Sequence, residues 1–194
     1  RFALDPGNGW QPGLVEPAIA KNARAAVLVH PNNPTGSWVD EAAAERLAAC
    51  TGGAAIPLIV DEVFLDFPLA SGAHAKSFAS RSTGLTFTLG GLSKSRGLPQ
   101  LKLSWIVVSG PDAEVAAALA ALEFIGDSYL SVGTPVQCAL PEILERAAPV
   151  RDAILARCRE NLALARRIVQ RAPAVELLEP GGGWSAVLRF PRVV

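Results

Sequence analysis

The sequence predicts an α/β fold in which a mostly parallel sheet carries helices on both faces, as an α/β/α sandwich. The start of a small α+β domain follows it. Short, continuously apolar runs such as 25–29 and 57–60 alternate with helical segments, and strands of this kind are buried on both faces of a parallel sheet. After residue 112 the chain becomes mainly helical, and two strand-like runs, 175–178 and 185–190, follow a long helix.

The first half of the chain supplies four expected strands and one helix. The first strand stops at the turn-forming run Pro31-Asn32-Asn33-Pro34-Thr35-Gly36, and the helix stops at Gly52-Gly53, since proline and glycine end regular elements. The strands are expected at 25–29, 57–60, 85–89 and 103–108, and the helix at 40–50. Alternation of this kind indicates crossover connections between parallel strands.

The second half predicts three helices, at 113–124, 135–147 and 150–171, the last with apolar residues on repeating faces. We therefore divide the chain into residues 1–147, part of a large domain, and residues 148–194, a connecting helix and the beginning of a small C-terminal domain. Residues 148–194 are too few to form a complete domain. Because the chain starts at Arg1 and contains no methionine, we expect it to be a piece of a longer protein.

Composition excludes several classes of function. Lys and Arg total 18 and Asp and Glu total 18, so no net charge favours nucleic acid or an anionic membrane. No apolar run approaches the roughly 18 residues of a membrane helix. Cys50, Cys138 and Cys158 are far apart and lack metal-ligand spacing. We expect a cytoplasmic protein with reduced thiols and without a bound metal.

Candidate functional residues follow three of the expected strands. Asn33 comes after the first strand, Asp61 ends the second, and Lys94 follows the third. In open α/β sheets, ligands bind beyond the carboxyl ends of the strands. Lys94 follows small residues that allow close approach of a ligand, as a Schiff-base lysine requires.

Each of these residues also has an ordinary structural explanation. A lysine in a glycine-rich loop is common at a protein surface, and asparagine is favoured in turns such as that of Asn33. The Asp61 carboxylate could cap a helix or form a salt bridge, because a buried carboxylate needs a partner. Its functional alternative is a counter-ion that keeps a pyridine nitrogen protonated.

The order of the motifs is more specific than any single residue. Pro31-Asn32-Asn33-Pro34-Thr35-Gly36, Asp61-Glu62-Val63-Phe64 and Ser93-Lys94-Ser95-Arg96-Gly97-Leu98-Pro99, with Lys102, follow one another at intervals of about thirty residues. In this the chain resembles the class I/II aminotransferases, which are fold-type I enzymes dependent on pyridoxal 5′-phosphate. The resemblance extends over residues 2–190.

The resemblance implies a role for each matching residue. Lys94 would form the Schiff base with pyridoxal phosphate and then move the proton between cofactor and substrate carbon. Asp61 would pair with the pyridine nitrogen, and Asn33 would donate to the phenolic oxygen of the cofactor. Ser93 and Lys102 would hold the phosphate. The domain of residues 1–147 would then be part of the large cofactor-binding domain.

Three positions depart from the family pattern. Lys102 stands where an arginine is usual, and it supplies a charge without the bidentate fork. Gly91 replaces a serine or threonine and removes a hydroxyl. Phe64 replaces a tyrosine, so it can pack near the cofactor without donating to the phenolic oxygen. The upstream phosphate loop, the ring-stacking residue and the carboxylate-binding arginine of the family are expected outside residues 1–194.

The function implied by the resemblance is amino-group transfer between an amino acid and a 2-oxo acid. Two alternatives stay open: a carbon–sulfur lyase or decarboxylase on the same scaffold, and an aminotransferase-like effector domain of a transcriptional regulator. We expect a homodimer in the full-length protein and no nucleic-acid or membrane partner. The 194-residue chain alone is expected to be inactive and to expose an apolar surface prone to association.

Overall fold

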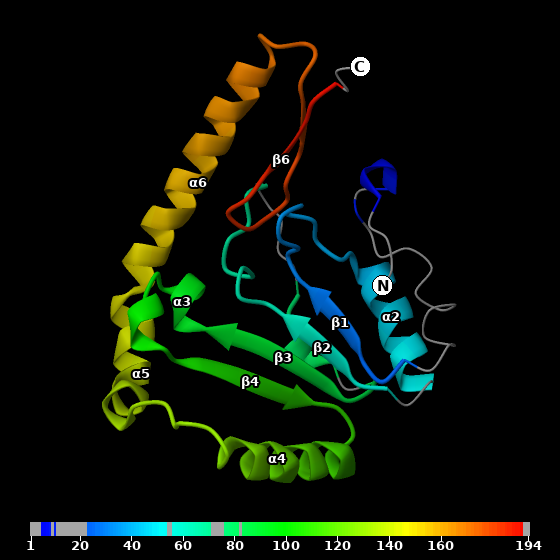
Figure 1. Cartoon of the computed structure of the whole chain (residues 1–194), viewed down its shortest axis with the longest axis vertical. Helices are drawn as coiled ribbons and strands as arrows, with labels where there is room; N and C mark the ends of the chain where they lie inside the picture. Colours follow the sequence, from blue (N-terminus) through cyan, green and yellow to red (C-terminus); the bar gives the residue numbers. More distant parts are fainter. Residues whose placement is uncertain are drawn as a thin grey trace.

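A four-stranded sheet forms the centre of the molecule, in the order β1-β2-β3-β4 (Figure 1). The computed structural model describes residues 5–8, 10, 23–53, 56–70, 76–81 and 83–191. The strands are β1 (Ala26–Val29), β2 (Leu58–Asp61), β3 (Thr86–Gly91) and β4 (Ser104–Ser109). The first three are mutually parallel, which confirms the expected α/β fold with a mostly parallel sheet.

The register of the sheet brings the expected functional segments together. Val29 lies opposite Asp61, and Asp61 lies opposite Leu89. The segments that follow β1, β2 and β3 therefore leave the sheet at one edge, because the carboxyl ends of parallel strands meet there. This edge carries the candidate site.

The fourth strand runs antiparallel to β3, a direction that the apolar pattern of residues 103–108 did not specify. The connection between β3 and β4 contains α3 (Leu92–Ser95) and the 3-10 helix η3 (Pro99–Leu101). Such a short link can return an antiparallel strand, whereas a parallel strand needs a longer crossover. Lys94 consequently lies in a short helix and not in an open loop.

The helix α2 (Glu41–Gly53) builds the hydrophobic core with the sheet. Asp40 accepts a 2.7 Å hydrogen bond from the Ala43 backbone N–H, so it caps the first turn. The buried core consists of Leu28, Ala44, Leu47, Leu58, Val60 and Phe78. Burial of each large apolar side chain contributes about 1.5–3 kcal/mol, which fixes β1 and β2 beneath α2.

The second half of the chain is helical, as its sequence predicts. It comprises α4 (Asp112–Gly126), α5 (Thr134–Arg146) and α6 (Ala148–Val169), then the antiparallel pair β5 (Glu176–Leu178) and β6 (Val187–Arg189). In Figure 1 α6 runs along one side of the molecule to the β5–β6 hairpin. Arg166 of α6 forms a 2.7 Å salt bridge with Glu179 after β5, which joins the two.

Two 3-10 helices complete the described elements: η1 (Pro6–Asn8) and η2 (Phe78–Ser80). The Phe78 side chain of η2 is 1% exposed and enters the core. The helices of the described residues include none that is both long and apolar enough to cross a membrane.

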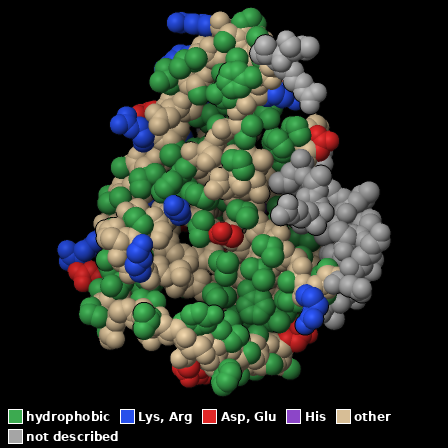
Figure 2. Space-filling view, in the orientation of Figure 1, with side chains coloured by type: hydrophobic (Ala, Val, Ile, Leu, Met, Phe, Trp, Pro, Cys, Tyr) green, Lys and Arg blue, Asp and Glu red, His purple; other side chains and the backbone are tan. Residues whose placement is uncertain are grey.

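Large hydrophobic side chains remain exposed on β4, on α4 and just after α4. They are Ile106, Val107, Leu119, Phe124, Ile125, Tyr129 and Leu130. Figure 2 shows hydrophobic side chains gathered over the lower part of the molecule, where β4 and α4 lie in Figure 1. An apolar surface of this kind favours association of the isolated chain.

Candidate active site

Lys94 is the centre of the candidate site. It lies in α3 and is half-buried, and its side chain makes no hydrogen bond or salt bridge within the described residues. Its Nζ atom lies 5.9 Å from the centroid of the Phe64 ring and 5.3 Å from that of the Trp184 ring. Both distances are within the range of a cation–π contact. The amine therefore faces two aromatic rings and has no hydrogen-bond or salt-bridge partner among the described residues.

Asp61 ends β2 and is half-buried. Its Oδ1 atom accepts a 3.1 Å hydrogen bond from the Val63 backbone N–H, so part of its role is to stabilise the turn that follows β2. Among the described residues, Oδ2 accepts no hydrogen bond and the carboxylate forms no salt bridge. One oxygen of Asp61 is therefore available to a cationic partner.

Asn33 lies in the turn that follows β1. The turn is closed by a 2.8 Å bond from the Gly36 N–H to the Asn32 carbonyl, and Thr35 Oγ1 donates to Asn32 Oδ1 at 2.9 Å. Asn33 itself is exposed, and its Oδ1 accepts from Ser185 Oγ at 3.5 Å. The Nδ2 donors of the Asn33 amide have no partner within the described part of the chain.

A glycine-rich turn, residues 181–183, docks on the Asn33 turn. The N–H groups of Gly181 and Gly182 both donate to the Gly36 carbonyl at 2.9 Å. Gly36 has φ +68°, and a Cβ there would lie 2.4 Å from the Pro180 Cβ. The position thus requires glycine both for its left-handed conformation and for close approach, and it fixes the C-terminal segment against the site.

Trp184 and Ser185 are site residues that sequence reasoning missed. Trp184 packs edge-to-face on Phe64, with ring centroids 5.4 Å apart, and on Phe67, with centroids 5.2 Å apart. The available signal was three consecutive glycines followed by a tryptophan. That run does not by itself indicate where the indole packs.

Ser93 and Lys102 occupy neighbouring backbone. The Leu92 N–H donates to the Leu103 carbonyl at 3.1 Å, and Gly91 pairs with Ser104. Lys102 is exposed, with the left-handed backbone angles φ 51° and ψ 36°. The start of α3 and the Lys102 segment therefore lie side by side, but within the described residues neither side chain contacts Lys94 or Asp61.

Arg96 braces the helix that contains Lys94. Its Nη1 donates to Asp66 Oδ2 at 3.0 Å and to the Ser95 carbonyl at 2.8 Å. Its Nε donates to the Leu144 carbonyl at 3.1 Å, near the end of α5. The guanidinium is only 14% exposed, so these charge-assisted bonds tie α3 both to the segment after β2 and to α5.

Two buried ionisable groups lie behind the site. His30 is 1% exposed, and its Nδ1 accepts from the Val39 N–H at 3.1 Å. Burial, together with the positive charge of Arg81, lowers the pKa of His30 from 6.5 to about 4. The imidazole is therefore neutral at pH 7, as this acceptor role requires.

Glu62 follows Asp61 but serves the fold. Its carboxylate accepts from Ser77 Oγ at 2.6 Å and from the Phe78 N–H at 2.7 Å. Burial raises the pKa of Glu62, although these two hydrogen bonds oppose the shift. The neighbouring carboxylates thus divide between two tasks: Glu62 anchors η2, while Asp61 faces the edge of the sheet.

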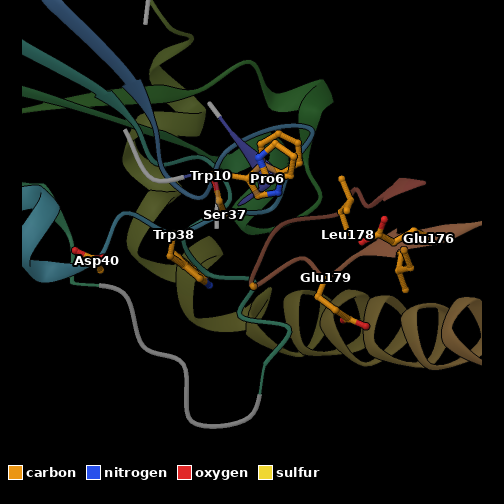
Figure 3. A pocket seen from close by; sticks show the side chains of 10 residues that line it. Pro6, Trp10, Ser37, Trp38, Asp40, Glu176, Leu178 and Glu179 are labelled. Atoms are coloured by element: carbon orange, nitrogen blue, oxygen red, sulfur yellow. The ribbon is translucent and has the colours of Figure 1, made fainter. Parts of the chain in front are cut away.

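A separate cavity of about 530 Å³ lies between η1, the segment after Gly36 and the β5 region (Figure 3). Its lining includes Trp10, Glu176 and Glu179, but neither Asp61 nor Lys94. Glu176 is paired with Arg189 and Glu179 with Arg166. Both glutamates of this cavity are therefore paired, and because the cavity includes neither Asp61 nor Lys94 it is not the candidate active site.

The polar side chains beyond the carboxyl ends of β1, β2 and β3 fit pyridoxal phosphate. Three polar groups at this edge make no hydrogen bond or salt bridge within the described residues: Nζ of Lys94, Oδ2 of Asp61 and Nδ2 of Asn33. They would meet an aldehyde carbon, a protonated ring nitrogen and a phenolic oxygen, respectively. An amine, an anionic acceptor and a neutral donor at one edge form the set that this group needs.

Comparison with known proteins identifies the class. The model of the family "Aminotransferase class I and II" matches residues 7–181. The chain is 24% identical over 196 residues to an alanine aminotransferase of Mycobacterium tuberculosis, covering 99% of this chain and 45% of the relative.

Two solved structures share the fold. An alanine aminotransferase from Pyrococcus furiosus superposes with a TM-score of 0.77 at 22% identity, covering 93% of this chain and 46% of that structure. A pyridoxal-phosphate-bound C–S lyase from Staphylococcus hominis superposes with a TM-score of 0.76 at 18% identity, covering 96% and 47%.

The chain belongs to the class I and II aminotransferase family, which confirms the resemblance drawn from its motifs. Pyridoxal 5′-phosphate is the cofactor of this class, and it is bound in the lyase that shares the fold. The chain spans about half the length of the relatives that it matches.

Proposed function

We propose that the protein containing this chain is an aminotransferase that moves an amino group between an amino acid and a 2-oxo acid. The observation that supports it most directly is Lys94, whose half-buried amine meets only two aromatic rings among the described residues. Pyridoxal phosphate, when bound, supplies the electron sink for the reaction. Residues 1–147 would belong to the cofactor-binding domain and residues 148–194 to the start of the small domain.

The residues of the chain would divide the work. Lys94 Nζ would hold the cofactor and then accept a proton at the substrate Cα and return it. Asp61 Oδ2 would accept the hydrogen bond of the protonated ring nitrogen and stabilise its charge. Asn33 Nδ2 would donate to the phenolic oxygen. Ser93 and Lys102 would bind the phosphate from the adjacent segments that begin and follow α3.

Phe64 follows β2 and lies beside the amine of Lys94. Its side chain is 9% exposed, and its ring lies 5.9 Å from Lys94 Nζ. A phenyl ring cannot donate a hydrogen bond, so Asn33 would be the donor to the phenolic oxygen among these residues.

The amino acid we propose as donor is alanine, with pyruvate as its 2-oxo acid. The M. tuberculosis and P. furiosus relatives are named alanine aminotransferases. The proposal for this chain also agrees with the aromatic surface of Phe64 and Trp184 beside Lys94, which suits a small apolar side chain better than a charged one. We also propose that the protein is cytoplasmic and forms a homodimer, as we expect from the sequence.

The natural gene product that contains this chain, purified with pyridoxal phosphate, tests the proposal. With L-alanine and 2-oxoglutarate we expect pyruvate and glutamate in equal amounts, and no product from the Lys94→Ala variant. Pyruvate and ammonia released from an S-alkyl cysteine, without consumption of the 2-oxo acid, would instead indicate a lyase. The absence of transfer from any amino acid in a cofactor-loaded protein would contradict the proposal.

A further inference from the structure

The indole of Trp184 is supported from behind by two buried rings. Its contacts with Phe64 and Phe67 are edge-to-face, at interplanar angles of 67° and 75°. Phe64 is 9% exposed and Phe67 is 0% exposed, whereas Trp184 is 38% exposed. The indole therefore packs on two buried rings while part of its surface stays open.

The backbone that leads to Trp184 is also fixed. The Gly183 N–H donates to the Phe67 carbonyl at 2.9 Å, and the Gly182 N–H donates to the Gly36 carbonyl at 2.9 Å. A Cβ at Gly182 would lie 2.4 Å from Trp38 Cζ2, which shows how closely the turn is packed. Trp184 thus projects from a backbone clamped between the Asn33 turn and the segment after β2.

The Trp184 indole lies beside the atom that would react. The indole centroid lies 5.3 Å from Lys94 Nζ. Proton transfer to the amine requires the substrate Cα to come within about 3 Å of Nζ. The Cα then lies at most about 8 Å from the indole centroid, so Trp184 neighbours the space that a substrate reacting at Lys94 would occupy.

The aromatic surface of Trp184 and Phe64 favours small apolar side chains over large or charged ones. Indole and phenyl surfaces gain from contact with a methyl group, and they impose a desolvation cost on a charged group without a partner. A long apolar side chain would have to displace an indole that Phe64 and Phe67 hold in place, and packed interiors yield little to such a push.

We propose that Trp184 determines specificity by limiting the side chain of the amino-acid substrate to a small apolar group. The inference rests on the proposed function and specifies the substrate class of the same site. Trp184 touches the substrate side chain and takes no part in proton transfer. Its removal therefore changes which amino acid is preferred more than it changes turnover of the smallest one.

The first test compares leucine with alanine as donors to the cofactor-loaded natural gene product. Trp184→Ala should raise the ratio of kcat/KM for leucine to that for alanine at least about tenfold, since even one methylene in a pocket is worth roughly 10–200-fold. Trp184→Phe retains a ring and should give a smaller rise. Phe190→Ala, at an exposed aromatic residue of the same C-terminal segment, is the matched control and should leave the ratio unchanged.

The second test measures binding without turnover. 2-Methylalanine and 2-methylleucine lack the hydrogen at Cα, so calorimetric titration yields their dissociation constants with no proton transfer. We expect Trp184→Ala to lower the Kd of 2-methylleucine relative to that of 2-methylalanine by about tenfold or more. Circular dichroism of each variant checks that the fold is retained, and Trp184→Phe provides the same comparison if the alanine variant does not fold.

The outcomes separate this inference from the proposed function. Ratios that stay within about twofold of wild type in both Trp184 variants would overturn the role of Trp184, and so would a wild-type protein that uses leucine as well as alanine. Shifted Kd ratios in a protein that transfers no amino group would contradict the proposed reaction alone and would leave Trp184 as a side-chain selector.

Discussion

The ring of Phe64 lies 5.9 Å from the Nζ atom of Lys94. Phe64 is 9% exposed, so it is both a core residue and a neighbour of the amine. Its position beside Lys94 supports the expectation that Phe64 packs near the cofactor.

Phe64→Tyr should lower the pH at which the absorbance of the bound cofactor titrates in the natural gene product. A tyrosine hydroxyl would join Asn33 as a second donor to the phenolic oxygen, whose negative charge would then be more stable. The proton shared with that oxygen would leave more easily. A spectroscopic pH titration of both proteins measures the change. An unchanged or higher titration pH would mean that residue 64 does not reach the cofactor.

Asp61→Asn should weaken cofactor retention and turnover together. The carboxylate stabilises a protonated ring nitrogen, and a neutral amide removes that charge interaction. Asp61→Glu keeps the charge and should retain more activity than Asp61→Asn. The measurements are the dissociation constant of pyridoxal phosphate and kcat with alanine. Equal values in all three proteins would reduce Asp61 to the capping bond with the Val63 N–H.

Lys102→Ala should raise the dissociation constant of pyridoxal phosphate. A lost charge-assisted contact is worth about 1.5–3 kcal/mol, and because Lys102 is exposed the effect should fall near the lower end, roughly tenfold. Lys102→Arg supplies a bidentate fork and should bind the cofactor at least as well as wild type. Fluorescence titration of the apoprotein measures all three, and equal affinity in Lys102→Ala would place the phosphate elsewhere.

Stability should fall on acidification because of His30. Its folded-state pKa, about 4, lies below the ordinary histidine value of 6.5, so between these values the unfolded chain binds more protons. The contribution is complete above about pH 6.5 and is lost as the pH falls toward 4. Its full size is about 3 kcal/mol. Burial raises the pKa of Glu62, so the contribution of Glu62 to stability changes with pH in the opposite direction. A variant is therefore needed to isolate the contribution of His30.

His30→Asn provides that comparison, because its side-chain oxygen can still accept from the Val39 N–H and does not titrate. Urea unfolding of both proteins between pH 4 and pH 7 gives the difference in free energy. We expect the wild type to lose about 2–3 kcal/mol more than the variant over this interval. If the free energy of unfolding depends on pH in the same way in both proteins, His30 is not the source of the loss of stability at low pH.

Local signals predicted the strands and the polar residues at their ends. Asn33, Asp61 and Lys94 each follow a short apolar run, and the parallel register of β1, β2 and β3 brings these runs to one edge. The antiparallel β4 was not predictable from its composition, because an edge strand of either direction has the same apolar pattern. Its direction depends on the short link through α3.

The contacts of Trp184 could not be read from its neighbours in sequence. They depend on the docking of Gly181 and Gly182 on the Gly36 carbonyl, a contact between segments far apart in the chain. The brace from Arg96 to Asp66 and the Leu144 carbonyl is of the same kind. Such tertiary contacts arise from the packing of α5, α6 and the C-terminal hairpin, which no motif encodes.

Lys94 as the cofactor lysine is tested most directly by reduction with borohydride. The chain contains Lys21, Lys76, Lys94 and Lys102, so peptide mapping after reduction of the cofactor-loaded natural gene product distinguishes every candidate within it. We predict a stable pyridoxyl adduct on Lys94 and none in the Lys94→Ala variant, with Lys76→Ala as the matched control that keeps the adduct. An adduct confined to any other lysine would contradict the assignment.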